Sequence, residues 1–179
     1  EDSPCTDMEL ELYRKLKAEF PASVGLVVQA YLKRTLNDIK NMNDIHSMES
    51  PVNLRVCKGI YVEPETLVYK GYAEINQSFI NDLEYMFQQK MYPAIATHDV
   101  QIINAAYALI EKYQVPRDAY EFQMLYGVTP SLRQSILDKG HRMRVYVPFG
   151  KQWFGYSTRR LKENPKMAGV ILKALFVKG

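Results

Sequence analysis

Short apolar segments alternate with amphipathic segments along most of this chain, and this alternation limits the folds open to it. The apolar segments have the length of β-strands, and several are rich in β-branched residues; they cover residues 24–28, 53–57, 93–97, 120–124 and 143–147. Before and between them, apolar residues recur at helical spacing in 6–19, 32–42, 75–90, 100–113 and 130–139. Alternating strands and helices predict βαβ units, and therefore an α/β fold around a parallel sheet.

Local signals mark where several helices begin and end. We expect two helices in 151–176, separated near Pro165, because proline disfavours helical backbone at the residue before it. Side chains suited to accept a hydrogen bond from the first helical turn stand at three helix starts: Ser3 before Pro4, Thr129 before Pro130, and Asp99.

The pattern leaves two architectures open, an open doubly wound sheet and a closed barrel. A length of 179 residues suggests about one domain, at ~150 residues per domain. A complete (β/α)8 barrel has eight strands and about 250 residues. The expected strands recur roughly every 30 residues, so eight such repeats would need about 240 residues, which fits a barrel. We find no linker, no low-complexity tract and no second domain.

Composition and missing motifs exclude several functions. The chain has 23 Lys and Arg against 20 Asp and Glu, a net charge of +3, so no strong field favours nucleic acid. The fingerprints of Rossmann, P-loop and Gly-x-Ser-x-Gly enzymes are absent. The three histidines and two cysteines lack metal-ligand spacing, and we expect free thiols in a reducing compartment. The longest apolar stretch, 167–177, is well short of the ~20 residues of a spanning helix, and the acidic start does not resemble a signal peptide.

Polar and aromatic residues gather where the expected strands end. Both architectures bind ligands at the carboxyl ends of parallel strands, so these residues are candidates for one shared site. Each also has a structural interpretation: Arg55 could form an ion pair, and His98 could belong to a helix cap. The candidates, in strand order, are Gln29; Arg55, Lys58, Gly59 and Tyr61; Thr97, His98 and Asp99; Gln123 and Tyr126; Tyr146; and, after the last strand, Arg159 and Arg160.

Five segments at these strand ends resemble the proline dehydrogenase family, most closely its bacterial monofunctional form. They occur in the family's order and extend over essentially the whole chain: VVQAYLKR at 27–34, LRVCKGIY at 54–61, ATHD at 96–99, YEFQMLYG at 120–127, and RVYVPFG at 144–150 leading to RRLKEN at 159–164. The resemblance implies a (β/α)8 TIM-type barrel of which this chain, as a single domain 1–179, supplies strands 4–8 and their helices. The first three strands would then precede Glu1, which is not an initiating Met.

The resemblance implies FAD as the cofactor. The residues that match FAD-contacting positions are Gln29, Arg55, Lys58, Thr97, His98, Gln123 and Glu163, with Val56 and Gly59 contributing backbone contacts. A flavin needs donors for its pyrophosphate and beside its reactive ring. Arg55 would be such a donor, and its positive charge would stabilise reduced, anionic flavin.

The resemblance also implies L-proline as the substrate and Δ1-pyrroline-5-carboxylate as the product. Arg159 and Arg160 match the pair that holds the proline carboxylate, a role that suits the guanidinium fork. Tyr146 matches the tyrosine on the proline ring, where an added hydroxyl would collide, and Tyr61 matches a second tyrosine of the pocket. The electrons would pass to a membrane quinone, from a cytoplasmic enzyme in peripheral contact with the inner membrane.

Three questions stay open at this stage. A hydroxyproline dehydrogenase on the same scaffold is an alternative, although a smaller residue than Tyr146 would suit it better. The chain could also be a non-catalytic barrel segment that needs a complementary N-terminal fragment, because five barrel strands leave two open sheet edges. The acidic member of the family's ion-pair gate could be Glu63, Glu65 or an upstream residue.

Overall fold

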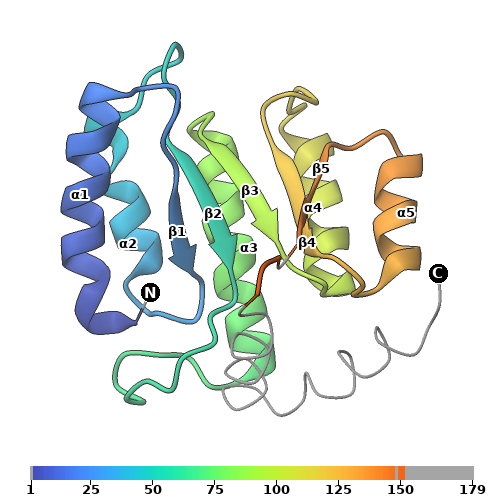
Figure 1. Ribbon diagram of the computed structural model, residues 1–179, viewed down its shortest axis with the longest axis horizontal. Coiled ribbons are helices and arrows are strands. Elements are labelled where there is room, and N and C mark those ends of the chain that lie inside the picture. Colours follow the sequence, from blue (N-terminus) through green and yellow to red (C-terminus); the bar gives the residue numbers. More distant parts are fainter. Residues whose placement is uncertain (1, 148, 152–179) are drawn as a thin grey trace.

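The strands form one parallel sheet in consecutive order. The computed structural model describes residues 2–147 and 149–151 (Figure 1). Its strands lie in the order β1-β2-β3-β4-β5, and all four pairings are parallel. A doubly wound sheet reverses its strand order at a switch point, and no reversal occurs among the described strands. The bounds are β1 (Leu26–Gln29), β2 (Asn53–Cys57), β3 (Tyr92–Ala96), β4 (Glu121–Leu125) and β5 (Met143–Tyr146).

The helices follow the sheet from one edge to the other. In Figure 1, α1 and α2 lie beside β1, α3 and α4 lie behind the middle strands, and α5 lies beside β5. None of the helices in the described part of the chain is both long and apolar enough to cross a membrane. The bounds are η1 (Ser3–Cys5), α1 (Thr6–Glu19), α2 (Thr35–Lys40), η2 (Asn43–Ile45), α3 (Tyr72–Gln88), α4 (Val100–Lys112) and α5 (Pro130–Asp138).

The expected elements are confirmed within the described residues, with small shifts at their ends. Helix 6–19 and strand 53–57 are as expected, and the other strands differ by one or two residues. The expected helix 32–42 is wrong at its start, because Leu32 bridges Val68 and Lys33 N donates to the Leu67 carbonyl. These contacts tie the chain after β1 to the loop after β2. The two helices expected in 151–176 lie outside the described residues.

One of the three expected helix caps is confirmed. The Asp99 carboxylate accepts a hydrogen bond from Gln101 N at 2.9 Å at the start of α4. The Ser3 cap is wrong, because Ser3 N and Oγ both donate to the Glu63 carboxylate, at 2.7 and 2.6 Å, and α1 begins only at Thr6. The Thr129 cap is also wrong: Thr129 has φ 43° and makes no side-chain cap bond. A residue in the left-handed region does not have the extended backbone of a usual N-cap.

The core lies between the sheet and the helices. Successive side chains of a strand point to opposite faces of the sheet. Every second strand residue therefore faces the helix layer, where it is almost fully buried. The apolar faces of α3 and α4 cover them, so the sheet and these helices share one hydrophobic cluster. Its members include Val28, Leu54, Val56, Ile95 and Phe122 from the strands, Phe79, Leu83 and Met86 from α3, and Ile102, Ile103 and Ala106 from α4.

The other face of the sheet carries a different set of side chains. The register aligns Val27 with Arg55, Arg55 with Ala94, and Ala94 with Glu121. Residues aligned in a parallel pair point to the same side of the sheet. On this face, which we call the inner face, the residues aligned with Val27 are polar or small and do not form a helix-packing surface.

One carboxylate on the helix side has no visible partner. Asp82 of α3 has no exposed surface, and neither of its oxygens has a hydrogen-bond partner. Burial raises the pKa of the Asp82 carboxyl to about 8, because the charged form cannot be solvated there. Asp82 is therefore protonated in the folded protein at neutral pH.

Asp82 should make stability fall as the pH rises. In the unfolded chain the carboxyl ionises near its ordinary pKa of 3.8, whereas in the folded protein it keeps its proton up to about pH 8. Between these values the folded state binds more protons, so the unfolding free energy decreases with pH by at most ~1.4 kcal/mol per unit. Asp82→Asn removes this slope in denaturant titrations at pH 4 to 8. The exposed carboxylate variant Asp138→Asn keeps the slope; a slope unchanged by Asp82→Asn contradicts the account.

Candidate functional site

The predicted site residues meet at the carboxyl ends of the strands, which we call the mouth. In Figure 1 this is the lower edge of the sheet, where the loop between β2 and α3 emerges. Gln29 ends β1, Lys58 and Gly59 follow β2, and Thr97 and His98 follow β3. Arg55 and Gln123 each lie two residues before the end of their strand, and Tyr146 ends β5. The sequence interpretation that places these residues at one edge is therefore confirmed by topology, while their roles stay predictions.

Arg55 and Gln123 form the central polar contact of the inner face. Arg55 Nε donates to Gln123 Oε1 at 2.9 Å, although β3 lies between their strands. The inward residues of β3 between these two side chains are Ala94 and Ala96, aligned with Arg55 and Gln123 respectively. Because these methyl groups are small, the long arginine side chain can cross β3 and reach β4. The alternative that Arg55 only forms an ion pair is not supported, since Arg55 donates its hydrogen bond to a neutral amide.

Lys58 is held in a second polar cluster at the mouth. Its ammonium lies 2.5 Å from Asp99 Oδ2 and 4.4 Å from the centre of the Tyr72 ring. The same oxygen accepts hydrogen bonds from Tyr72 Oη at 2.6 Å and from Asn76 Nδ2 at 3.3 Å. Burial alone would raise the pKa of Asp99, but the hydrogen bonds from Lys58 and Tyr72 outweigh it and lower the pKa to about 2. Asp99 thus caps α4 through one oxygen and fixes Lys58 through the other.

His98 connects two strand ends. Its Nε2 accepts a hydrogen bond from Leu125 N at 3.0 Å. Burial lowers the pKa of His98, so the ring is neutral near pH 7 and its proton is on Nδ1. The neighbouring Thr97 is buried, and its Oγ1 accepts from Asp99 N at 3.1 Å. His98 therefore joins β3 to β4 and keeps one N–H for a ligand.

Gly59 shapes the start of the loop that carries Tyr61. Gly59 has φ 108°, and an added Cβ would lie 2.1 Å from the Tyr31 ring. Tyr31 cannot easily retreat, because its N donates to the Lys58 carbonyl and its carbonyl accepts from Tyr69 N, both at 2.8 Å. Only glycine fits between these two loops.

Several predicted residues are not brought to the mouth or fall outside the described chain. The Val56 side chain is fully buried in the core, on the helix side of β2, so only its backbone could approach a cofactor. Glu63, one candidate for the gate, is 7% exposed and accepts two hydrogen bonds from Ser3. Arg159, Arg160 and Glu163 lie outside the described residues.

The structure adds residues that sequence reasoning did not select. Tyr72 and Asn76 lie in the first two turns of α3, where both donate to Asp99 and Tyr72 also covers Lys58. Nothing in the loop sequence fixes how far α3 lies from β3. Glu121, two positions before Gln123, shares its strand face and contacts it. The sequence could have indicated Glu121, because residues two apart in a strand share a face and Gln123 was already a candidate.

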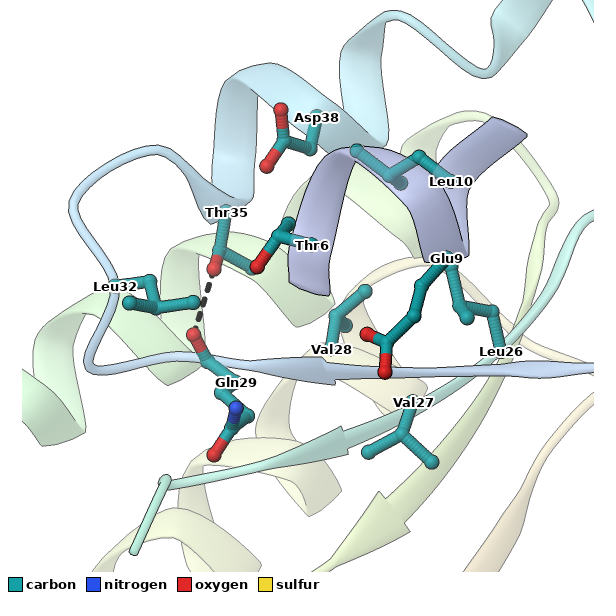
Figure 2. A pocket seen from close by; sticks show the side chains of 10 residues that line it. All are labelled: Thr6, Glu9, Leu10, Leu26, Val27, Val28, Gln29, Leu32, Thr35 and Asp38. Carbon is teal, nitrogen blue, oxygen red and sulfur yellow. Dashed lines mark hydrogen bonds between the residues drawn. The ribbon is translucent and has the colours of Figure 1, made fainter. Parts of the chain in front are cut away.

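A small cavity lies on the helix side of β1, between α1 and α2. Figure 2 shows Val28 and Thr35 on this side, with Thr35 Oγ1 donating to the Gln29 carbonyl at 2.6 Å. The side chains of Val27 and Gln29 point to the opposite, inner face (Figure 2). Gln29, which ends β1 at the mouth, also lines this cavity, so the cavity adjoins that end of β1 from the helix side.

The donor set at the mouth fits FAD. Lys58 and Arg55 are cationic, and His98 offers an N–H, so phosphate oxygens and the polar edge of a flavin would both find donors. Among residues 2–147 and 149–151, no group of three or more His, Cys, Asp or Glu could hold a metal ion.

Comparison with known proteins agrees with this geometry. The sequence model of the family described as proline dehydrogenase matches residues 1–171. Proline dehydrogenase of Deinococcus radiodurans is 35% identical over 176 residues, 98% of this chain and 55% of the relative. Proline dehydrogenase 1 of Bacillus subtilis (strain 168) is 37% identical over 178 residues, 99% of this chain and 57% of the relative. The chain therefore spans little more than half the length of these relatives.

The fold is also found in solved structures. Proline utilization A from Bdellovibrio bacteriovorus, inactivated by N-propargylglycine, matches with a TM-score of 0.81 and 29% identity, over 92% of this chain and 19% of that chain. The expected class, a (β/α)8 TIM-type barrel to which this chain contributes five strands, is confirmed.

Gly59→Ala should destabilise the protein far more than the same change at another left-handed glycine. We expect a loss of ~3 kcal/mol or more, because the methyl group meets the Tyr31 ring and the backbone is strained. Gly140 has φ 74° but nothing within 4 Å of an added Cβ, so Gly140→Ala should cost only ~1 kcal/mol. Equal losses in denaturant unfolding would contradict the packing described here.

Proposed function

The chain belongs to the proline dehydrogenase family, and we propose that the protein containing it oxidises L-proline to Δ1-pyrroline-5-carboxylate with FAD as the oxidant. The observation that carries the proposal is the Arg55–Gln123 contact on the inner face, at the mouth of a parallel sheet of this family. A guanidinium fixed at that place can face an electron-rich ring without having to be ordered on binding. The predicted cofactor residues and the roles of Tyr61 and Tyr146 form part of this proposal.

The chemistry requires little acid–base work from the protein. A hydride leaves C5 of proline and a proton leaves the ring nitrogen, so that the C–N bond becomes double. Bound FAD would supply the acceptor for this hydride. Arg55 would stabilise the negative charge that accumulates beside it, and Lys58 and His98 would bind and orient the cofactor. Positioning of the reactants thus supplies most of the rate enhancement.

The proposal extends to residues outside the described part of the chain. Arg159 and Arg160 would hold the substrate carboxylate, and Glu163 would contact the cofactor. The electrons would leave through a membrane quinone, with a cytoplasmic enzyme touching the membrane surface only peripherally.

The site would be complete only in a closed barrel. β1 and β5 each have a pairing partner on one side only, so the described sheet has two edges. We propose that residues 1–179 form one domain that supplies the C-terminal part of a barrel, closed by further strands. A non-catalytic segment that needs a complementary fragment is the second candidate, and these open edges are the observation that favours it.

The natural full-length protein should purify with flavin absorption in the visible range, and L-proline should bleach that absorption in the absence of oxygen. The two candidates differ here, because a segment with only a structural role would take up no flavin. Absorption spectra before and after addition of L-proline, with D-proline as the control, provide the measurement. A protein without flavin, or with flavin that L-proline does not reduce, would contradict the proposed oxidation of L-proline with FAD.

Tyr146 provides a test between proline and hydroxyproline as substrates. Tyr146 ends β5 at the mouth, where its bulk would exclude a hydroxyl on the proline ring. We expect the parent protein to turn over L-proline at least tenfold faster than hydroxyproline, and Tyr146→Ser to narrow that ratio. Tyr113→Ser, at the C-terminal end of α4 and away from the mouth, is the matched control. A parent that prefers hydroxyproline would favour the alternative dehydrogenase.

A further inference from the structure

The inner face carries a continuous chain of hydrogen bonds that extends beyond the residues expected to touch the cofactor. Arg55 donates to Gln123 Oε1, and Gln123 Nε2 donates to Glu121 Oε1 at 2.7 Å. Glu121 in turn accepts from Arg144 Nε at 2.6 Å and from Arg144 Nη2 at 2.9 Å. Glu121 therefore contacts Gln123 but not Arg55, and Gln123 alone separates it from the residue expected to face the cofactor.

This arrangement allows the Gln123 amide only one orientation. A guanidinium can only donate, so the amide oxygen must face Arg55. An ionised carboxylate can only accept, so the amide nitrogen must face Glu121. If the amide turned over, its NH2 group would face the Arg55 donor and its oxygen would face the Glu121 carboxylate, so neither hydrogen bond could form.

Glu121 is built to stay ionised although it is buried. Its side chain is 4% exposed, whereas that of Arg144 is 69% exposed. Burial alone would raise the pKa of Glu121, but the hydrogen bonds from Arg144 and Gln123 outweigh it and lower the pKa. Tyr92 Oη adds a longer contact to Oε2 at 3.3 Å. A charged, acceptor-only group is thus maintained beside Gln123.

We propose that Glu121 is a positioning residue: by holding the Gln123 amide in one orientation, it keeps the Arg55 guanidinium directed at the flavin. The inference rests on the proposed function, because the flavin is the group that Arg55 would face. Glu121 itself touches neither cofactor nor substrate in this account. Glu121 acts through the Gln123 amide, which fixes the orientation of the Arg55 side chain. Because this amide is neutral, it does not offset the positive charge of Arg55.

Glu121→Gln tests the proposal with almost no change of volume. The new amide can donate as well as accept, so Gln123 is free to turn and to present its NH2 group to Arg55. Arg55 then loses its acceptor. In the natural full-length protein with FAD, we expect about tenfold weaker FAD binding by calorimetry and a more negative flavin reduction potential, because reduced flavin loses a fixed positive charge.

Glu121→Asp separates positioning from packing. Aspartate is smaller but remains an acceptor-only anion, so it still dictates the orientation of the Gln123 amide. Positioning predicts that the Asp variant keeps a potential and an FAD affinity close to those of the parent, while the Gln variant does not. A purely structural role predicts the reverse order, since Asp leaves a cavity and Gln leaves none.

Glu84→Gln is the matched control. It breaks the Glu84–Lys112 ion pair, 2.7 Å long, on the outer surface of α3 and α4, and should leave both flavin readouts unchanged. If Glu121→Gln does not fold, the Asp variant still decides, because a shifted potential or lost FAD affinity there overturns the proposal.

The outcomes also separate this inference from the proposed function. Parent protein that binds no FAD contradicts the proposed function. Parent protein that binds FAD, together with a Glu121→Gln variant of unchanged potential and affinity, overturns the positioning role alone. A lowered melting temperature with unchanged flavin readouts has the same consequence.

Discussion

The alternation of side chains across each strand is the constraint on which the rest of this structure depends. One face of the sheet must be apolar because helices α3 and α4 pack on it, and Leu54 and Val56 meet that demand on β2. Arg55 between them must then point to the other face. The same parity that builds the core therefore decides which residue points to the inner face, and a shift of one residue would exchange the two faces.

The inner face shows how a charged residue can be kept in a fixed direction without being neutralised. An ion pair with Arg55 would have cancelled part of its field, whereas the Gln123 amide leaves the charge intact. The nearest carboxylate in this chain of contacts, that of Glu121, lies beyond Gln123 and forms an ion pair with Arg144 of β5. Lys58 shows the opposite solution, since Asp99 pairs with it directly and Tyr72 covers it. The two cations of the mouth are thus differently compensated.

Much of the fold follows from periodicity, and much of the site does not. Strand 53–57 and helix 6–19 are predicted within their observed bounds because strong local patterns agree with the tertiary structure there. The start of α2 is missed because Leu32 and Lys33 bond to the loop after β2, a contact between segments far apart in sequence. The Ser3 cap fails for the same reason, since Glu63 takes its hydrogen bonds. Topology brings Gln29, Lys58 and Tyr146 to one edge, but the partners of Lys58 depend on helix placement that no local pattern encodes.

The central claim is that the inner face holds Arg55 across β3, with Nε bonded to the Gln123 amide before any ligand arrives. A crystal structure of the natural full-length protein, determined with and without bound FAD, tests this most directly. The account predicts Arg55 Nε within hydrogen-bond distance of Gln123 Oε1 in both structures, with the remaining guanidinium nitrogens beside the flavin in the loaded one. An Arg55 side chain that lies elsewhere without FAD, or a flavin bound away from Arg55, would contradict it.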